Sequence, residues 1–198
     1  MTQEEKQHLL KIDICGRLPY GMKFYDETHL DTPKIEAYCS DDYADAWSSG
    51  VKGGFSAVDR VFEPLDCAPL LRPIEDLCRE ITHAGYNDGL PFYPAVKLAN
   101  IGIIFPPDQE FTPNQGSYTS NGGVKYSTYG CESDWYQFAY HIDMRSFVII
   151  NKDSRESYHV KNQPMLFDLM NRLMIDYRGL IPAGLAKSVH DLDKNPYE

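Results

Sequence analysis

The sequence lacks the motifs that identify most enzymes. It contains no dinucleotide-binding GxGxxG, no P-loop, no HExxH zinc-protease motif and no GxSxG nucleophile motif. Its five cysteines are scattered, and no two of them have the CxxC spacing of a zinc site. No apolar run reaches the roughly 18 residues of a transmembrane helix. We therefore expect no metal, no cofactor and no membrane-spanning segment.

Basic residues are also fewer than acidic residues: the chain has 19 Lys and Arg and 29 Asp and Glu, and its formal net charge is −10. A protein that holds nucleic acid through phosphate contacts needs a basic face. Nucleic acid is therefore not an expected partner. An acidic chain can instead bind a basic partner or mimic nucleic acid, but this charge density is ordinary for a soluble protein and disfavours mimicry.

The first residues, MTQEEKQHLL, are acidic and polar, unlike a secretory signal peptide. A cytoplasmic location is therefore expected. In that compartment the cysteines would be thiols, and most of them are interpreted as small buried apolar residues.

The sequence predicts one α+β domain over residues 1–198. A mainly antiparallel sheet, either open or rolled into a small barrel, would carry three helices, predicted at residues 2–18, 74–83 and 164–176. Runs of strands lie between these helices without regular βαβ alternation, which favours this class. The hydrophobic content of 42% is enough to form a core.

The clearest helical signal lies near the C-terminus, in residues 163–186. The apolar residues there recur at i, i+3, i+4 and i+7. They are Leu166, Leu169, Met170 and Leu173. Asn162 is the expected N-cap, and Gly179 the expected stop. A second short helix is predicted to begin at Pro182.

Several strands are predicted from alternating or continuous apolar residues. They cover residues 21–25, 34–39, 55–62 and 95–105. The strongest β signal, residues 134–150, exceeds the usual strand length of about five or six residues. It predicts either a hairpin that turns near Asp143 or one long bent strand. The acidic residues 26–45 lack the glycine and distal glutamate of an EF-hand, so a solvated loop is expected there.

Residues 106–130 predict a long loop or insertion rich in Tyr, Ser and Gly. Loops of this length are usually functional or disordered, and this composition is typical of antibody-type binding loops. We expect a binding surface here whose contact residues, with two neighbours that extend it, are Tyr118, Tyr126, Tyr129, Trp135 and Tyr136. The alternative is a surface hairpin with Asn121 and Gly122 at its tip, or tyrosines that fold back onto the sheet.

The best catalytic constellation is His141 with Asp143, and with Cys131 as nucleophile. A histidine oriented by a carboxylate can act as a base and can activate a nearby cysteine. On one continuous strand, His141, Asp143 and Arg145 would share a face. A turn at Asp143 would instead break this alignment.

Three segments resemble an uncharacterised family of small proteins from gut Bacteroidota and their phages and mobile elements. They are LLKIDICGRLPYGM at residues 9–22, LLRPIEDL at residues 70–77 and DYRGLIPAGLA at residues 176–186. Met174 stands where the family pattern often has histidine, and the region from about Leu90 to Val160 has no counterpart. The resemblance implies a biological context and no particular chemistry.

Two classes of function follow. The first is a non-enzymatic interaction protein that binds a protein partner, an accessory protein of a phage or mobile element. The second is a small hydrolase-like enzyme that uses His141, Asp143 and Cys131. Three side chains meeting in one pocket would favour the enzyme.

Overall fold

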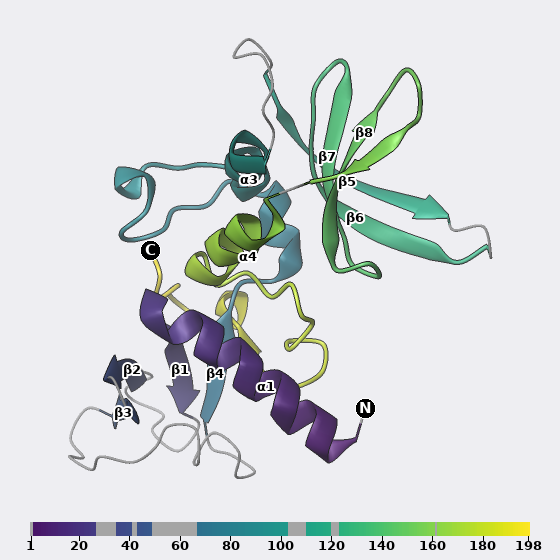
Figure 1. The fold of residues 1–198 in the computed structure, drawn as a ribbon. Coiled ribbons are helices and arrows are strands. Elements are labelled where there is room, and N and C mark those ends of the chain that lie inside the picture. Colours follow the sequence, from purple (N-terminus) through teal and green to yellow (C-terminus); the bar gives the residue numbers. More distant parts are fainter. Residues whose placement is uncertain are drawn as a thin grey trace. The chain divides into compact units, whose positions relative to one another are not determined.

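The computed structural model describes residues 2–26, 35–40, 43–48, 67–102, 110–119, 123–160 and 162–198 (Figure 1). These residues form helices and two sheets of five strands, in which almost all strand pairs are antiparallel. The predicted α+β class is therefore confirmed. The chain divides into two compact units, Met1–Pro73 with Arg178–Pro196 and Ile74–Tyr177 with Tyr197–Glu198. Each unit is described by itself, and the single-domain organisation stays a prediction.

The first unit contains helix α1 (Gln3–Arg17), which continues into the 3-10 turn η1 (Leu18–Tyr20). A capping box begins the helix: the Thr2 hydroxyl accepts from the Glu5 N–H at 3.2 Å, and the Glu5 carboxylate accepts from the Thr2 N–H at 2.6 Å. These bonds satisfy backbone donors that a helix N-terminus leaves unpaired. The helix predicted at residues 2–18 is confirmed.

The sheet of the first unit has the strand order β10-β4-β1-β2-β3. Its strands are β1 (Lys23–Asp26), β2 (Ile35–Ser40), β3 (Tyr43–Ser48), β4 (Cys67–Leu71) and β10 (Lys187–Ser188). Only β10 and β4 form a parallel pair among the described strands. Strands β1 and β2 confirm the predictions near residues 21–25 and 34–39. The strand predicted at residues 55–62 lies outside the described residues.

Two expectations for this unit are wrong. The acidic residues 26–45 do not form one loop, because they contain β2, which pairs along six positions with β3, a strand that begins at Tyr43. The second C-terminal helix is absent from the described residues 180–186, which form turns closed by backbone bonds such as Leu185 N–H to Leu180 C=O at 2.9 Å. Pro182 and Gly184, whose φ is +69°, favour such turns over a continuous helix.

A buried ion cluster joins the N-terminal and C-terminal parts of the first unit. Arg17 donates to both carboxylate oxygens of Asp13, from Nε at 2.6 Å and from Nη2 at 3.0 Å. The Nε atom of Arg178 lies 3.2 Å from the Asp13 Oδ1 atom. The Asp13 and Arg17 side chains are fully buried. Two of the segments that carry the family resemblance, residues 9–22 and 176–186, therefore meet through one carboxylate.

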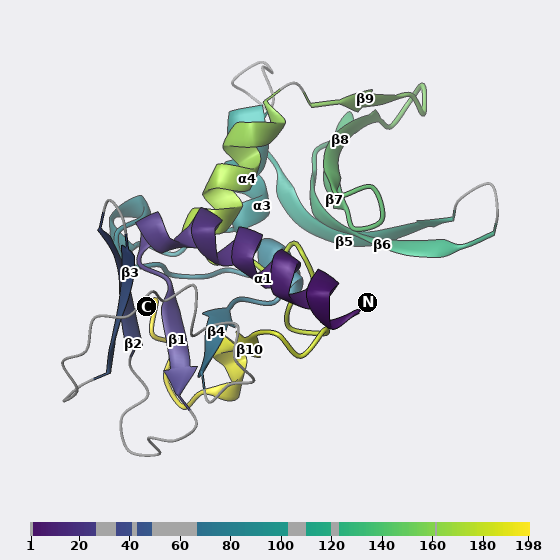
Figure 2. The ribbon, with the colours of Figure 1, turned by 60° about the horizontal axis from the view of Figure 1, so that its bottom comes forward.

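The second unit contains an antiparallel sheet whose strands follow the chain in order. They are β5 (Thr112–Thr119), β6 (Lys125–Glu132), β7 (Tyr136–His141), β8 (Ser146–Asn151) and β9 (Ser157–His159). Figure 2 shows how strongly this sheet curls from β5 to β9. The hairpin predicted near Asp143 is confirmed, because residues 142–145 turn between β7 and β8.

The long loop predicted at residues 106–130 is wrong for its described part. Strands β5 and β6 pair there over eight positions, from Thr112 opposite Glu132 to Thr119 opposite Lys125. Both strands contain few apolar residues, so no apolar alternation indicated them in the sequence. Their Tyr and Thr residues nevertheless favour strands. The hairpin alternative is the one the structure has. Its proposed tip at Asn121 and Gly122 lies outside the described residues.

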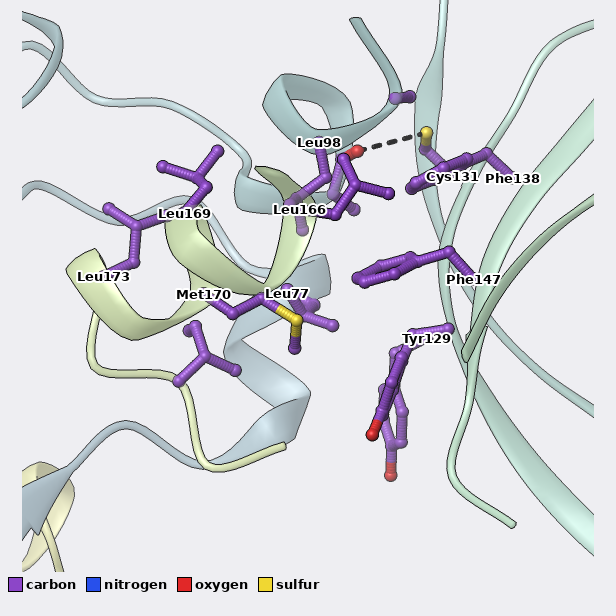
Figure 3. Close-up of a cluster of buried hydrophobic side chains, with 14 of the residues drawn as sticks. Leu77, Leu98, Tyr129, Cys131, Phe138, Phe147, Leu166, Leu169, Met170 and Leu173 are labelled. Carbon is purple, nitrogen blue, oxygen red and sulfur yellow. Dashed lines mark hydrogen bonds between the residues drawn. The ribbon is translucent and has the colours of Figure 1, made fainter. Parts of the chain in front are cut away.

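Helices α3 (Pro94–Gly102) and α4 (Gln163–Arg172) cover one face of this sheet together with the 3-10 turn η2 (Ile74–Cys78). A further 3-10 turn, η3 (Asn87–Gly89), lies between η2 and α3. In Figure 3, Leu98, Leu166 and Met170 point from the helices towards Phe138 and Phe147 of the sheet. Helix α4 confirms the predicted C-terminal helix, although the Asn162 side chain makes no capping bond.

Two other helix and strand predictions are wrong. The helix predicted at residues 74–83 stops with η2, because Ile81 exchanges two backbone hydrogen bonds of 2.9 Å with Phe92. The strand predicted at residues 95–105 is helix α3 as far as Gly102. Ala95, Leu98 and Ala99 are buried at helical spacing, and a short apolar run alone does not distinguish a strand from a buried helix.

Replacing Leu173 with alanine should lower the free energy of unfolding by about 2–5 kcal/mol, as truncation of a buried leucine does. The Leu173 side chain is fully buried in the core that α4 shares with the sheet. Urea denaturation followed by circular dichroism measures the change. An unchanged midpoint would contradict the packing of this residue, and the exposed Met165→Ala on the same helix is the control.

Candidate functional site

The structure does not assemble the predicted catalytic constellation. Cys131 lies opposite Phe138, whereas His141 lies opposite Thr128 three positions along β6. Side chains alternate between the two faces of a sheet, so Cys131 and His141 point to opposite faces. Cys131 belongs to the buried core, where its thiol donates to the Ala95 carbonyl at 3.5 Å (Figure 3). Burial raises the pKa of this thiol to about 12, so it is protonated at neutral pH and a poor nucleophile.

His141 and Asp143 do not share a strand face either. His141 is the last residue of β7, Asp143 lies in the turn, and Arg145 has a left-handed backbone with φ of 47°. The turn therefore breaks the alignment that one continuous strand would give. Burial lowers the pKa of His141 below its ordinary value of 6.5, and the Asp143 carboxylate opposes part of this effect.

Because the folded state disfavours the protonated form of His141, the unfolded chain binds this proton more readily. The free energy of unfolding should therefore fall as the pH drops through 6.5 towards the lower pKa of the folded state. Urea denaturation at several pH values should show a shallower dependence for His141→Gln than for the parent. Equal pH dependence in both proteins would contradict this assignment.

The predicted tyrosine surface is only partly where it was expected. Tyr129 is 5% exposed, lies in the core and donates its hydroxyl to Glu75 at 3.2 Å. Tyr118 and Tyr126 are opposite one another in β5 and β6, but their side chains are outside the described part of the structure. Tyr136 is half-buried, and Trp135 is 56% exposed.

Trp135 lines a surface pocket of about 520 Å³ at the end of the sheet where β6 turns into β7. Known ligand pockets range from about 300 to 1,000 Å³, so this volume fits a side chain with its flanking main chain. The lining residues come from the start of β5 and the segment just before it, from the end of β6 and the β6–β7 turn, and from the β8–β9 turn. They are Glu110, Thr112, Glu132, Ser133, Asp134, Trp135 and Lys152.

Hydrogen bonds fix the turn that carries Trp135. The Ser133 N–H donates to the Tyr136 carbonyl at 2.8 Å, and the Lys152 N–H donates to the Trp135 carbonyl at 2.9 Å. The Lys152 ammonium donates to the Ser133 carbonyl at 2.9 Å and lies 3.4 Å from the Glu132 carboxylate. The backbone at Trp135 is therefore held by the β8–β9 turn while the indole remains exposed.

The pocket is acidic. Three carboxylates, Glu110, Glu132 and Asp134, line it beside a single ammonium group, that of Lys152. Within the described residues, no three His, Cys, Asp or Glu side chains form a group that would hold a metal ion. The arrangement suits the binding of a polar, positively charged group rather than metal chemistry.

Sequence reasoning found Trp135 but missed Glu110, Glu132 and Lys152. These three residues are far apart in the chain, and only the strand register brings them to the same end of the sheet. No pattern in the sequence itself pointed to the two glutamates.

No family model matches this chain, and neither does any curated protein or solved structure. The resemblance to the Bacteroidota family therefore stays a prediction. Among the described residues, no helix has both the length and the apolar character needed to span a membrane.

Proposed function

We propose that this protein is a non-enzymatic interaction protein that binds a protein partner at the pocket beside Trp135. The observation that supports this most is the indole itself, which is 56% exposed on a turn whose backbone is hydrogen-bonded on both sides. Tryptophan is enriched at the energetic centres of protein interfaces. A partner that covered this ring would bury its apolar surface beside the pocket.

The rigidity of the turn also supports a binding role. Association costs the free energy of ordering side chains and loops at the interface, and a surface already held in place avoids part of that cost. Lys152 supplies this order through its backbone N–H and its ammonium group. The interface would therefore use a preformed contact rather than one that folds on binding.

An accessory role in a phage or mobile element, and a cytoplasmic location, belong to the same proposal. The accessory role is supported by the sequence resemblance. The competing catalytic function has less support, because Cys131 and His141 lie on opposite faces of the sheet.

Selection from a random peptide library displayed on phage tests the proposal without knowledge of the partner. We expect enriched peptides that bind the parent protein and lose binding to Trp135→Ala. The control is Leu90→Ala, which removes a side chain that is 62% exposed in the same unit but does not line the pocket. Enriched peptides that bind Trp135→Ala as tightly as the parent would contradict the proposal, as would a selection that enriches nothing.

A further inference from the structure

We infer that the pocket beside Trp135 takes a basic side chain of the partner, arginine or lysine, between the indole and the carboxylates of Glu110 and Asp134. This inference rests on the proposed function and specifies the chemistry of its ligand. Three independent features converge on it: a cavity large enough for a side chain, an exposed aromatic ring and an excess of negative charge.

The negative charge of the pocket is only partly neutralised. Lys152 is committed to Glu132 and to the Ser133 carbonyl. Within the described residues, no cation pairs with Glu110 or Asp134, and both residues are exposed. Two carboxylates at one pocket therefore remain available to a positive charge from outside, and a chain with a net charge of −10 attracts such a partner over a distance.

The ring of Trp135 is suited to the same ligand. Tryptophan offers the best aromatic face for a cation. The described residues place Arg172 over Tyr86 and Lys187 over Tyr25, but no cation over Trp135. Lys152 is near enough to line the pocket, yet its ammonium is directed to Ser133 and Glu132. The indole face is thus available to a guanidinium or ammonium group of the partner.

Other ligand classes fit less well. An anionic ligand would meet three carboxylates, and the single ammonium present is already hydrogen-bonded. A purely apolar ligand would leave those carboxylates desolvated without a partner, which costs free energy. A basic side chain satisfies both the ring and the carboxylates, and its hydrocarbon stem can lie along the indole.

The direct test uses short peptides of blocked glycine with one central residue: arginine, lysine or citrulline, the neutral analogue of arginine. The indole N–H resonance of Trp135, assigned with Trp135→Phe, reports binding by NMR titration. We expect saturable shifts with the arginine and lysine peptides, weakened by added salt, and no shift with citrulline. Equal shifts with citrulline, or no shift with any peptide, would overturn the inference.

A second test removes the negative charges of the pocket. The double variant Glu110→Gln with Asp134→Asn should bind the arginine peptide about threefold to tenfold more weakly, as expected for exposed ion pairs and a cation–π contact that lose their supporting charge. The matched control, Glu80→Gln with Asp88→Asn, removes the same charge from exposed positions of the same unit outside the pocket. If both double variants bound the arginine peptide equally weakly, the loss of affinity would come from net charge alone. That result would contradict a specific site at the pocket.

The library selection separates this inference from the function on which it rests. Peptides that require Trp135 and are rich in arginine or lysine support both. Peptides that require Trp135 but carry no basic residue would support the proposed binding function and contradict the inference that the ligand is a basic side chain. Peptides indifferent to Trp135→Ala would overturn the proposed function itself.

Discussion

Gly130→Ala is expected to destabilise the second unit by at least about 3 kcal/mol, or to prevent its folding. An alanine Cβ at this position of β6 would overlap the Phe138 carbonyl oxygen and lie 2.8 Å from the Ala139 Cα atom, both in the backbone of β7. Overpacking costs about 1–3 kcal/mol even where side chains can move aside. Here the obstacle is the neighbouring strand, so relief requires that the β6–β7 pairing itself shift.

Gly116→Ala on the adjacent strand β5 is the matched control. Its Cβ would lie 3.1 Å from the Thr128 hydroxyl, a side-chain atom rather than backbone, so a small shift relieves the contact. We expect a change below about 1 kcal/mol there, within the range of tolerated strand substitutions. Urea denaturation and near-ultraviolet circular dichroism of both variants decide the matter. If Gly130→Ala folds with the stability of Gly116→Ala, the close approach of β6 and β7 is wrong.

Asp13→Asn should cost the first unit about 3–5 kcal/mol, the usual penalty for removing one partner of a buried ion pair. Asparagine keeps the size of the side chain but removes the charge that Arg17 and Arg178 share. The Arg17 side chain is fully buried. Its guanidinium would therefore lose its carboxylate without regaining water.

The control is Glu4→Gln, an exposed acidic residue in the first turn of the same helix α1. It should cost less than about 1 kcal/mol, the typical value of a charge near a helix terminus. Thermal and urea denaturation compare the two variants. A similarly small loss in Asp13→Asn would mean that the ion cluster contributes little to stability.

Local signals in the sequence predicted those elements whose structure depends on near neighbours. The apolar spacing of Leu166 to Leu173 identified α4, and the capping box of Thr2 and Glu5 that begins α1 is an equally local feature. The hairpin of β7 and β8 followed from a β-rich stretch too long for one strand. In each case the residues that determine the element lie within a few positions of one another.

Elements that depend on distant partners were misread. The largely polar residues of β5 and β6 form strands because β6 pairs through its backbone with β5 on one side and β7 on the other, which no apolar pattern reports. The helical signal after Cys78 ended where Ile81 pairs with Phe92. The pocket at Trp135 depends on the same kind of information, since Glu110 and Lys152 reach it only through the order of the strands.

The ion cluster of the first unit has a consequence for synthesis on the ribosome. Asp13 and Arg17 emerge early, whereas Arg178 and strand β10, which pairs with β4, are translated after the whole of residues 74–177. Chains grow at about 5–20 residues per second, and domains generally fold as units as they emerge. The second unit, continuous but for its last two residues, has most of its chain available before the first unit does. At this rate nascent α1 waits roughly 8 to 32 seconds for Arg178, the residue that completes its buried charge cluster.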